Sequence, residues 1–140
     1  MDRQGLIRFL QSQKLAVLGT VAADGSPQGA VVGIATSDAG EVVFDTLTST
    51  RKARNLRERP RGSITAWQGD VTVQLEGVAD EPAGDERARL LDVYFGPYPD
   101  GKDRLAWTGI THFRVRPTWA RYTDFGATPP VEVEIEWPAD

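Results

Sequence analysis

The sequence predicts a mainly β, α+β domain in which an antiparallel sheet curls into a barrel. Three observations lead to this fold class. Six or more short apolar or β-branched runs recur along the chain, and many of them end at tight-turn signals such as Asp-Gly. Only two or three short segments show helical spacing. A closed or nearly closed sheet would protect the many strand edges that such a pattern creates.

The first third of the chain predicts one helix followed by three strands. Residues 2–13 carry apolar side chains at helical spacing, so a short amphipathic helix is expected there. The apolar runs 15–21, 30–35 and 41–46 predict strands, and turns rich in Asp, Ser and Gly separate them. Tight connections of this kind predict a three-stranded antiparallel meander.

The middle of the chain predicts two helices on either side of a hairpin. Residues 50–59 form the first of these helices, which Ser49 or Thr50 can cap and Pro60 ends. The hairpin strands are expected over 63–67 and 71–79, and the next helix over 85–95. Residues 96–104, with Gly, Pro and Asp in close succession, predict a loop.

The last third of the chain predicts three more strands. Two of them, 111–115 and 119–125, are separated by Pro117. The C-terminal tail, 126–140, contains a run from 131 to 137 in which apolar and acidic residues alternate strictly. Such alternation indicates one apolar and one solvated face, which explains the row of glutamates without a metal site. We expect residues 1–140 to form one domain that includes this tail strand.

The composition of the 140-residue chain excludes several kinds of site. The chain has no cysteine and one histidine, so thiolate chemistry, disulfides and a histidine metal cluster within one chain are ruled out, and no metal site is predicted. The formal net charge of −4 argues against nucleic-acid or membrane partners. The N-terminus lacks the apolar core of a signal peptide, and no run could cross a bilayer. We therefore expect a cytoplasmic protein.

A cluster of basic residues follows the third predicted strand. A solvated helix face is the ordinary explanation for such a cluster. However, Arg51 and Lys52 fall in the first helical turn, where the helix dipole already disfavours cations. The preceding residues, Thr46, Thr48, Ser49 and Thr50, supply hydroxyl groups, and the helix start supplies unpaired N–H groups. The segment therefore predicts a site for a phosphate monoester.

This segment resembles the pyridoxamine phosphate oxidase-like, split β-barrel flavoprotein superfamily. The matching pieces are Asp45-Thr46, the hydroxyl-rich turn 48–50, Arg51-Lys52, and Glu-Arg-Pro-Arg at 58–61. The hairpin 19–35 and the strand 71–80 are also similar to the family, and the resemblance covers roughly residues 6–125. It implies a split β-barrel with short peripheral helices, a homodimer, and flavin mononucleotide (FMN) bound at the dimer interface.

The resemblance also implies roles for individual residues. Arg51 and Lys52 would bind the FMN phosphate with help from Ser49 or Thr50, and Thr46 would contact the ring or the ribityl chain. Thr72 stands where many relatives carry glutamine, and Gln74 on the same strand face is a substitute. Trp107 is the tryptophan best placed to stack on the ring. The remaining expected contacts are Asp45 and the strand residues Ala30, Val31, Val32 and Gly33.

Departures from the oxidase proper narrow the expected activity. Ala30 and Ala35 replace an arginine and a lysine of the oxidase, and the C-terminal Arg-x-His substrate element is missing. Oxidation of vitamin B6 itself is therefore not predicted. We expect an FMN-dependent oxidoreductase that takes hydride from NAD(P)H or passes it to a small organic acceptor. Its substrate and its catalytic side chains are not identified by the sequence.

Three alternatives remain open at this stage. Relatives of the same fold use the deazaflavin coenzyme F420 in place of FMN, and others bind haem. The basic helix could also belong to a non-catalytic module that binds an acidic partner. The only histidine, His112, alternates with Phe113 and Val115 and shares a face with Arg114 and Arg116. We expect that face to be wet, and His112 to be a surface or interface residue rather than a proton donor.

Overall fold

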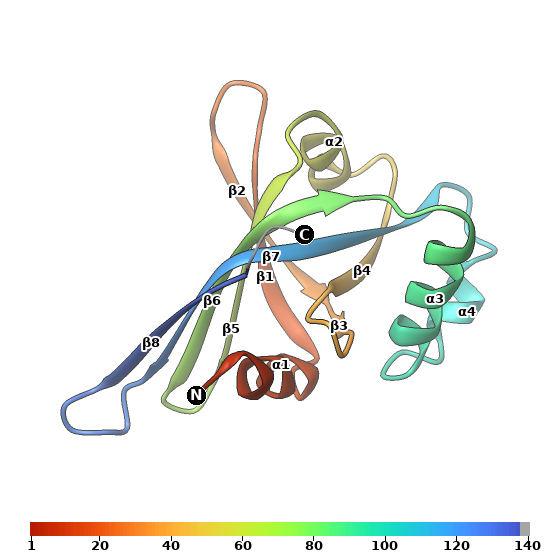
Figure 1. Ribbon diagram of the computed structural model, residues 1–140. Helices are drawn as coiled ribbons and strands as arrows, with labels where there is room; N and C mark the ends of the chain where they lie inside the picture. The colour runs from red at the N-terminus through yellow and green to blue at the C-terminus, as the bar shows by residue number, and fades with distance from the viewer. Residues whose placement is uncertain (138–140) are drawn as a thin grey trace.

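The computed structural model describes residues 1–137, which are built around one strongly curled antiparallel sheet (Figure 1). The strands are β1 (Leu15–Val21), β2 (Pro27–Gly33), β3 (Ala35–Thr36), β4 (Val42–Leu47), β5 (Arg61–Gln68), β6 (Val71–Asp80), β7 (Ile110–Asp124) and β8 (Val131–Glu136). The helices are α1 (Arg3–Gln11), α2 (Arg51–Glu58), α3 (Gly84–Phe95) and α4 (Gly101–Arg104). The predicted mainly β split-barrel architecture is confirmed.

The strand order explains how the sheet curls. It runs β2-β1-β5-β6-β7-β4-β3, with β8 paired to β7 beside this path. Strands β2 and β3 are consecutive in the chain but lie at the two ends of the order, so the short link through buried Ile34 joins both ends. The backbone N–H of Ile34 donates to the Lys14 carbonyl at 2.9 Å, which fixes this link against β1.

The predicted three-stranded meander is wrong in its pairing. The expected second strand is divided, because β2 pairs with β1 whereas Ala35 and Thr36 pair with β4. The main partner of β4 is β7, with Phe44 opposite Phe113. This pairing results from closure of the barrel, which brings β7 next to β4 and cannot be predicted from the turns between neighbouring strands.

Two further expectations of the sequence are corrected. Strand β7 runs through Pro117 without a break. Opposite Glu76 and Gly77 the register shifts, so that Thr118 is an extra residue in β7, and this irregularity accommodates Pro117, which has no N–H to donate. A side chain at Gly77 would collide with the Arg116 carbonyl oxygen, so the close approach requires glycine there. The expected loop 96–104 contains the short helix α4, whose Arg104 pairs with the N-cap residue Asp100 at 2.8 Å.

The helices close the ends and one outer face of the barrel. Helix α1 lies at one end and α2 at the other (Figure 1). Leu6 and Leu10 of α1 and Leu56 of α2 join the barrel core, in which Phe44 and Phe113 stack with ring centroids 5.7 Å apart. None of the helices within residues 1–137 has both the length and the apolar character needed to cross a membrane.

Helix α3 covers the outer face of β4 and β7, where the sequence predicted a wet surface. His112 and Arg114 are each only 4% exposed, so the expectation of a surface histidine is wrong. Arg114 is neutralised by Asp80, Glu86 and Glu41, at distances between 2.6 and 3.0 Å. Burial lowers the pKa of His112, whose ring packs edge-on against Tyr94 with centroids 5.6 Å apart. A charged strand face could therefore be buried because α3 and neighbouring segments supply carboxylates.

The C-terminal tail forms a strand, as predicted. Ile135 and Trp137 pack against the core, and the guanidinium of Arg3 lies 5.3 Å from the centre of the Trp137 ring. The β7–β8 hairpin extends away from the body of the barrel (Figure 1). Residues 138–140 of the predicted tail lie outside the described residues.

Candidate functional site

The predicted phosphate site is a hollow at the start of α2. The hollow has a volume of about 600 Å³ and lies between α2 and the β1–β2 hairpin. No carboxylate lines it. Five of the predicted cofactor residues line this hollow together: Ala30, Ser49, Thr50, Arg51 and Lys52. We refer to it as the α2 pocket.

The helix start has the geometry that the sequence predicted. Thr50 is the N-cap, and its hydroxyl oxygen accepts a hydrogen bond from the Ala53 N–H at 3.3 Å. Arg51 and Lys52 are therefore the first two helical residues, and the first turn contains no acidic side chain. Their N–H groups have no partner within the helix. Two cations, hydroxyl groups and the positive end of the helix thus face one hollow.

Thr46 supports this helix start from behind. Its side chain is 7% exposed, and its hydroxyl lies 2.9 Å from the Thr50 hydroxyl. The Thr50 hydroxyl is also 2.9 Å from the Leu47 carbonyl, to which it donates. Thr46 therefore contacts the capping residue and is not among the residues that line the α2 pocket.

Three polar residues that the sequence reasoning missed, Thr20, Gln28 and Asn55, join α2 to the β1–β2 hairpin beside Arg51. The buried Asn55 amide donates to the Thr20 hydroxyl at 3.0 Å and lies 2.8 Å from the Gln28 amide. With its amide oxygen turned towards Arg51, Gln28 accepts a hydrogen bond from Arg51 Nε at 3.1 Å. Thr20 and Gln28 line the α2 pocket. The available signal was Asn55, which lies between the apolar residues Ala53 and Leu56 of a basic helix.

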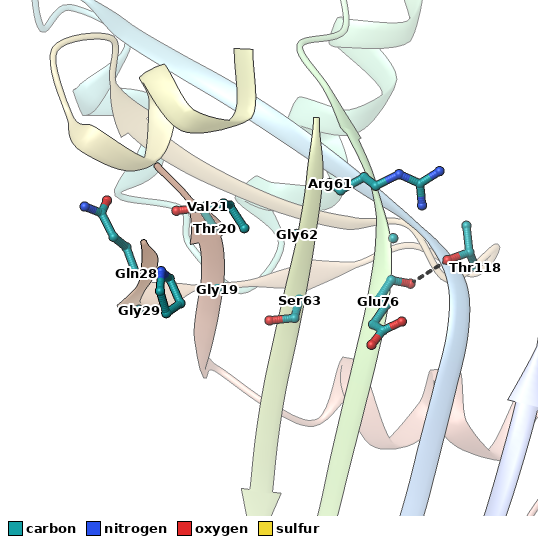
Figure 2. Close-up of a pocket in the computed structure, with 12 residues that line it drawn as sticks. Gly19, Thr20, Val21, Gln28, Gly29, Arg61, Gly62, Ser63, Glu76 and Thr118 are labelled. Carbon is teal, nitrogen blue, oxygen red and sulfur yellow. Dashed lines mark hydrogen bonds between the residues drawn. The ribbon is translucent and has the colours of Figure 1, made fainter. Parts of the chain in front are cut away.

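A shallow groove continues from the α2 pocket across the outer face of the sheet. It has a volume of about 530 Å³ and shares Thr20, Gln28 and Gly29 with that pocket. The strand registers align four residues across its floor: Gly29, Gly19, Ser63 and Glu76. Figure 2 shows the bare backbone at the two glycines beside Ser63, with Arg61 and Glu76 farther across the sheet. At Gly29 the nearest atom to an added Cβ would be 3.7 Å away, which leaves room for a flat group against the backbone, whereas the Ser63 hydroxyl lies over Gly19.

The remaining predicted residues do not converge on the α2 pocket within one chain. Val31, Thr72 and Gln74 lie on the outer face of the sheet, where the register places Gln74 two strands away from Val17 and three strands away from Val31. Val32 is 6% exposed and belongs to the core. The α2 pocket and this outer face are therefore separate groups of predicted residues.

Gly33, Asp45 and Trp107 have other neighbours. The Tyr98 ring covers Gly33, where an added Cβ would lie 2.9 Å from it. Asp45 accepts a hydrogen bond from Arg104 Nε at 2.6 Å, which ties α4 to β4. Trp107 is 55% exposed in the link between α4 and β7. A hydrogen bond of 2.7 Å from Thr48 N–H to the Gly109 carbonyl brings that link next to the loop before α2.

Comparison with known proteins identifies the family. The family profile described as pyridoxamine 5'-phosphate oxidase matches residues 6–124. The chain belongs to this oxidase family. A curated relative, the pyridoxine/pyridoxamine 5'-phosphate oxidase of Bordetella avium, is 34% identical over 124 residues. That match covers 81% of this chain and 56% of the relative, so the chain spans little more than half of the relative's length.

Solved structures of similar fold include proteins with different ligands. A haem binding protein from Mycobacterium smegmatis has a TM-score of 0.83 at 21% identity, over 95% of this chain and 57% of the other. An FMN binding protein of Nostoc punctiforme, related to pyridoxamine 5'-phosphate oxidase, has a TM-score of 0.69 at 11% identity, over 94% and 91% of the two chains. At these identities the likeness shows the fold alone.

The residues of this family member fit a phosphate ester better than a metal or an acid–base centre. The α2 pocket offers an arginine fork, a lysine and hydroxyl donors. Within residues 1–137 there is no group of three or more side chains suited to hold a metal ion. The only histidine is 4% exposed under α3 and is not among the residues that line the α2 pocket, so it is not placed for proton transfer there.

Proposed function

We propose that the protein binds FMN and uses it as a flavin-dependent oxidoreductase acting on a small molecule. The observation that supports this proposal most directly is the α2 pocket, where Arg51, Lys52 and the Thr50 cap surround a hollow without carboxylates. The phosphate of FMN is held there by charge-assisted hydrogen bonds. The groove over Gly29 leaves space for the flat part of the cofactor.

A homodimer would unite the two separate groups of predicted residues. Val31, Leu15 and Trp67 form an apolar patch on the outer face of the sheet and are 66%, 61% and 58% exposed. Thr72 and Gln74 lie on that face, with Thr72 paired directly with Trp67. Apolar side chains that large favour burial against a partner. We propose that the patch packs on a second copy, whose α2 pocket then receives Thr72 and Gln74.

In this arrangement the protein binds and orients the flavin, and bound FMN supplies the hydride chemistry. With its amide oxygen turned towards Arg51, Gln28 holds that arginine before any ligand arrives, which reduces the entropy lost on binding. NAD(P)H or a small organic acceptor is the proposed reaction partner, and the reaction needs no side-chain acid or base in the α2 pocket.

Oxidation of pyridoxamine phosphate is not part of the proposal. Ala30 leaves the α2 pocket without the strand arginine of the oxidase proper. Ala35 is 4% exposed and packs under α3 with Leu90 and Tyr94. A residue at this position faces the hydrophobic layer and not a substrate, so the position does not supply a phosphate-binding cation.

The direct test is to titrate purified apoprotein with FMN and with riboflavin. FMN is expected to bind at least ~100-fold more tightly than riboflavin, since charge-assisted bonds to the phosphate contribute roughly 1.5–3 kcal/mol each. In Arg51→Gln/Lys52→Gln this preference should vanish while riboflavin affinity stays the same. Equal affinity of the original protein for both ligands would mean that the phosphate is not recognised in the α2 pocket.

The purified protein also allows haem binding and deazaflavin binding to be distinguished from FMN binding. The M. smegmatis structural neighbour binds haem, but the one histidine of this chain is buried under α3 and the chain has no cysteine. Ligation of haem iron by His112 would require α3 to move. A Soret band that survives in His112→Gln would mean that the cofactor is haem and not FMN. A deazaflavin mass in the extracted cofactor would mean that it is a deazaflavin.

A further inference from the structure

A second basic hollow adjoins the α2 pocket. It has a volume of about 350 Å³ and lies between the β1–β2 turn, at Ala22 and Ala23, and the outer flank of α2. Arg51 and Gln28 line both hollows. The two hollows therefore meet at the Arg51 guanidinium, the group assigned above to the FMN phosphate.

Arginines outnumber carboxylates among the residues that line the second hollow. Arg51, Arg54 and Arg59 line it, against the single carboxylate of Glu58. That carboxylate pairs with Arg59 at 3.1 Å, and Arg57 pairs with Glu81 at 2.6 Å. Among the residues that the structure describes, these are the ion pairs of α2 and its C-cap. Arg51 and Arg54 form no ion pair among the described residues, in a chain whose net charge is −4. Asp24 in the β1–β2 turn is the nearby carboxylate: hydrogen bonds from Ser26 and, less strongly, the charge of Arg51 lower its pKa.

The spacing of these arginines suits an elongated anion. Arg51 and Arg54 are three residues apart on α2, so their Cβ atoms are roughly 5–6 Å apart and their side chains are neighbours. Arg59 is fixed at the far side, because its Nε donates to the Val21 carbonyl at 2.9 Å. Like charges on adjacent helical turns repel each other, and an anion that bridges them removes this cost.

We propose that the two hollows together take a diphosphate ester, namely the dinucleotide form of the flavin, FAD. This inference rests on the proposed flavin function and extends it. One phosphate lies in the α2 pocket and the other beside Arg54, with Arg51 between them. The neutral walls at Ala22 and Ala23 leave the hollow open where the adenosine would continue.

The test compares ligands with no phosphate, one phosphate and two phosphates. Riboflavin, FMN and FAD are titrated into apoprotein, and the quenching of flavin fluorescence gives each Kd. FAD is expected to bind at least as tightly as FMN. Arg54→Gln should weaken FAD by about ten-fold, the value of one charge-assisted hydrogen bond, and FMN by less than about two-fold. The matched control is Arg8→Gln, which removes an exposed arginine from α1 at the opposite end of the barrel (Figure 1) and should change neither affinity.

Competition with inorganic anions separates the diphosphate from the adenosine. Pyrophosphate should displace FMN at lower concentration than phosphate does, and Arg54→Gln should remove this advantage. Two results would overturn the second-phosphate inference but leave FMN binding intact. In one, the protein binds FMN but binds FAD at least ten times more weakly. In the other, Arg54→Gln lowers the affinities for FMN and FAD equally. Failure of both FMN and FAD to bind overturns the proposed function as well.

Discussion

The side-chain amide of Asn55 on α2 donates a hydrogen bond of 3.0 Å to the hydroxyl of Thr20 on β1, and both residues are almost fully buried. This bond fixes α2 against the β1–β2 hairpin at the point where the α2 pocket opens. The Gln28 amide lies 2.8 Å from the Asn55 amide and, with its oxygen turned towards Arg51, accepts a hydrogen bond from that arginine. The position of the proposed phosphate ligand is thus set from the core of the barrel.

Asn55→Ala is expected to lower both stability and cofactor affinity. It leaves the buried Thr20 hydroxyl without this donor, which costs about 1–3 kcal/mol of unfolding free energy. It also removes the side chain that packs against the Gln28 amide, so FMN affinity should fall while riboflavin affinity does not. Urea unfolding and the two titrations measure these effects. A matched control, Asn55→Ala/Thr20→Val, removes both polar partners and should recover part of the stability but not the FMN affinity.

Gly77→Ala is expected to destabilise the fold much more than Gly29→Ala. An added Cβ at Gly77 meets the Arg116 carbonyl and lies 2.8 Å from Val115 Cγ1, whereas at Gly29 its nearest atom is 3.7 Å away. Overpacking of this kind typically costs about 1–3 kcal/mol. Thermal unfolding of both variants measures the difference. Equal melting temperatures would show that β7 relaxes around the irregularity at Thr118.

Trp67→Glu is expected to convert the proposed dimer into monomers. The substitution places a charge in the apolar patch next to Thr72, where burial against a second copy would leave the charge desolvated. Sedimentation velocity measures the change in mass. Phe125→Glu, a change at another exposed aromatic residue, 60% exposed beyond the end of β7, serves as the control and should leave the mass unaltered. A Trp67→Glu protein that keeps the dimer mass would place the interface elsewhere.

Glu41 should make the stability of the protein depend on acid pH. Hydrogen bonds from Arg89, and further ones from Ser37 and Arg114, lower the pKa of Glu41 from 4.5 to about 2. Because the folded pKa is depressed, the stabilisation is complete above the unfolded pKa and is lost as the pH falls from about 4.5 towards 2. Glu41→Gln should therefore flatten the stability profile across this window, as read by urea unfolding at several pH values. If stability depended on pH to the same extent in Glu41→Gln, Glu41 would not be the source of this acid dependence.

Local features of the fold could be read from the sequence. The helix predicted over 50–59 is α2, Thr50 is its cap, and strand β1 has the predicted bounds. These features depend on near neighbours in the chain, which the sequence displays directly. The assembly of Ser49, Thr50, Arg51, Lys52 and Ala30 around one hollow also follows, because the resemblance placed the hairpin beside the helix start.

Features that depend on distant segments could not be read in the same way. The pairing of β4 with β7 results from closure of the barrel, and the burial of Arg114 depends on carboxylates from β6, α3 and the β3–β4 turn. Gln28 looked like an ordinary strand residue until the structure placed it between Asn55 and Arg51. The α4 helix likewise depends on a tertiary contact, that of Arg104 with Asp45.

The glutamates of β8 bear on how copies of the protein meet in solution. Strand β8 is hydrogen-bonded to β7 along one side, and it carries Glu132, Glu134 and Glu136, of which Arg121 contacts the first two. If the other side added the same strand from another molecule, carboxylates would stand opposite carboxylates. Electrostatic repulsion thus disfavours edge-to-edge pairing of β8 strands from different molecules at neutral pH. Acidification protonates these carboxylates and removes that protection.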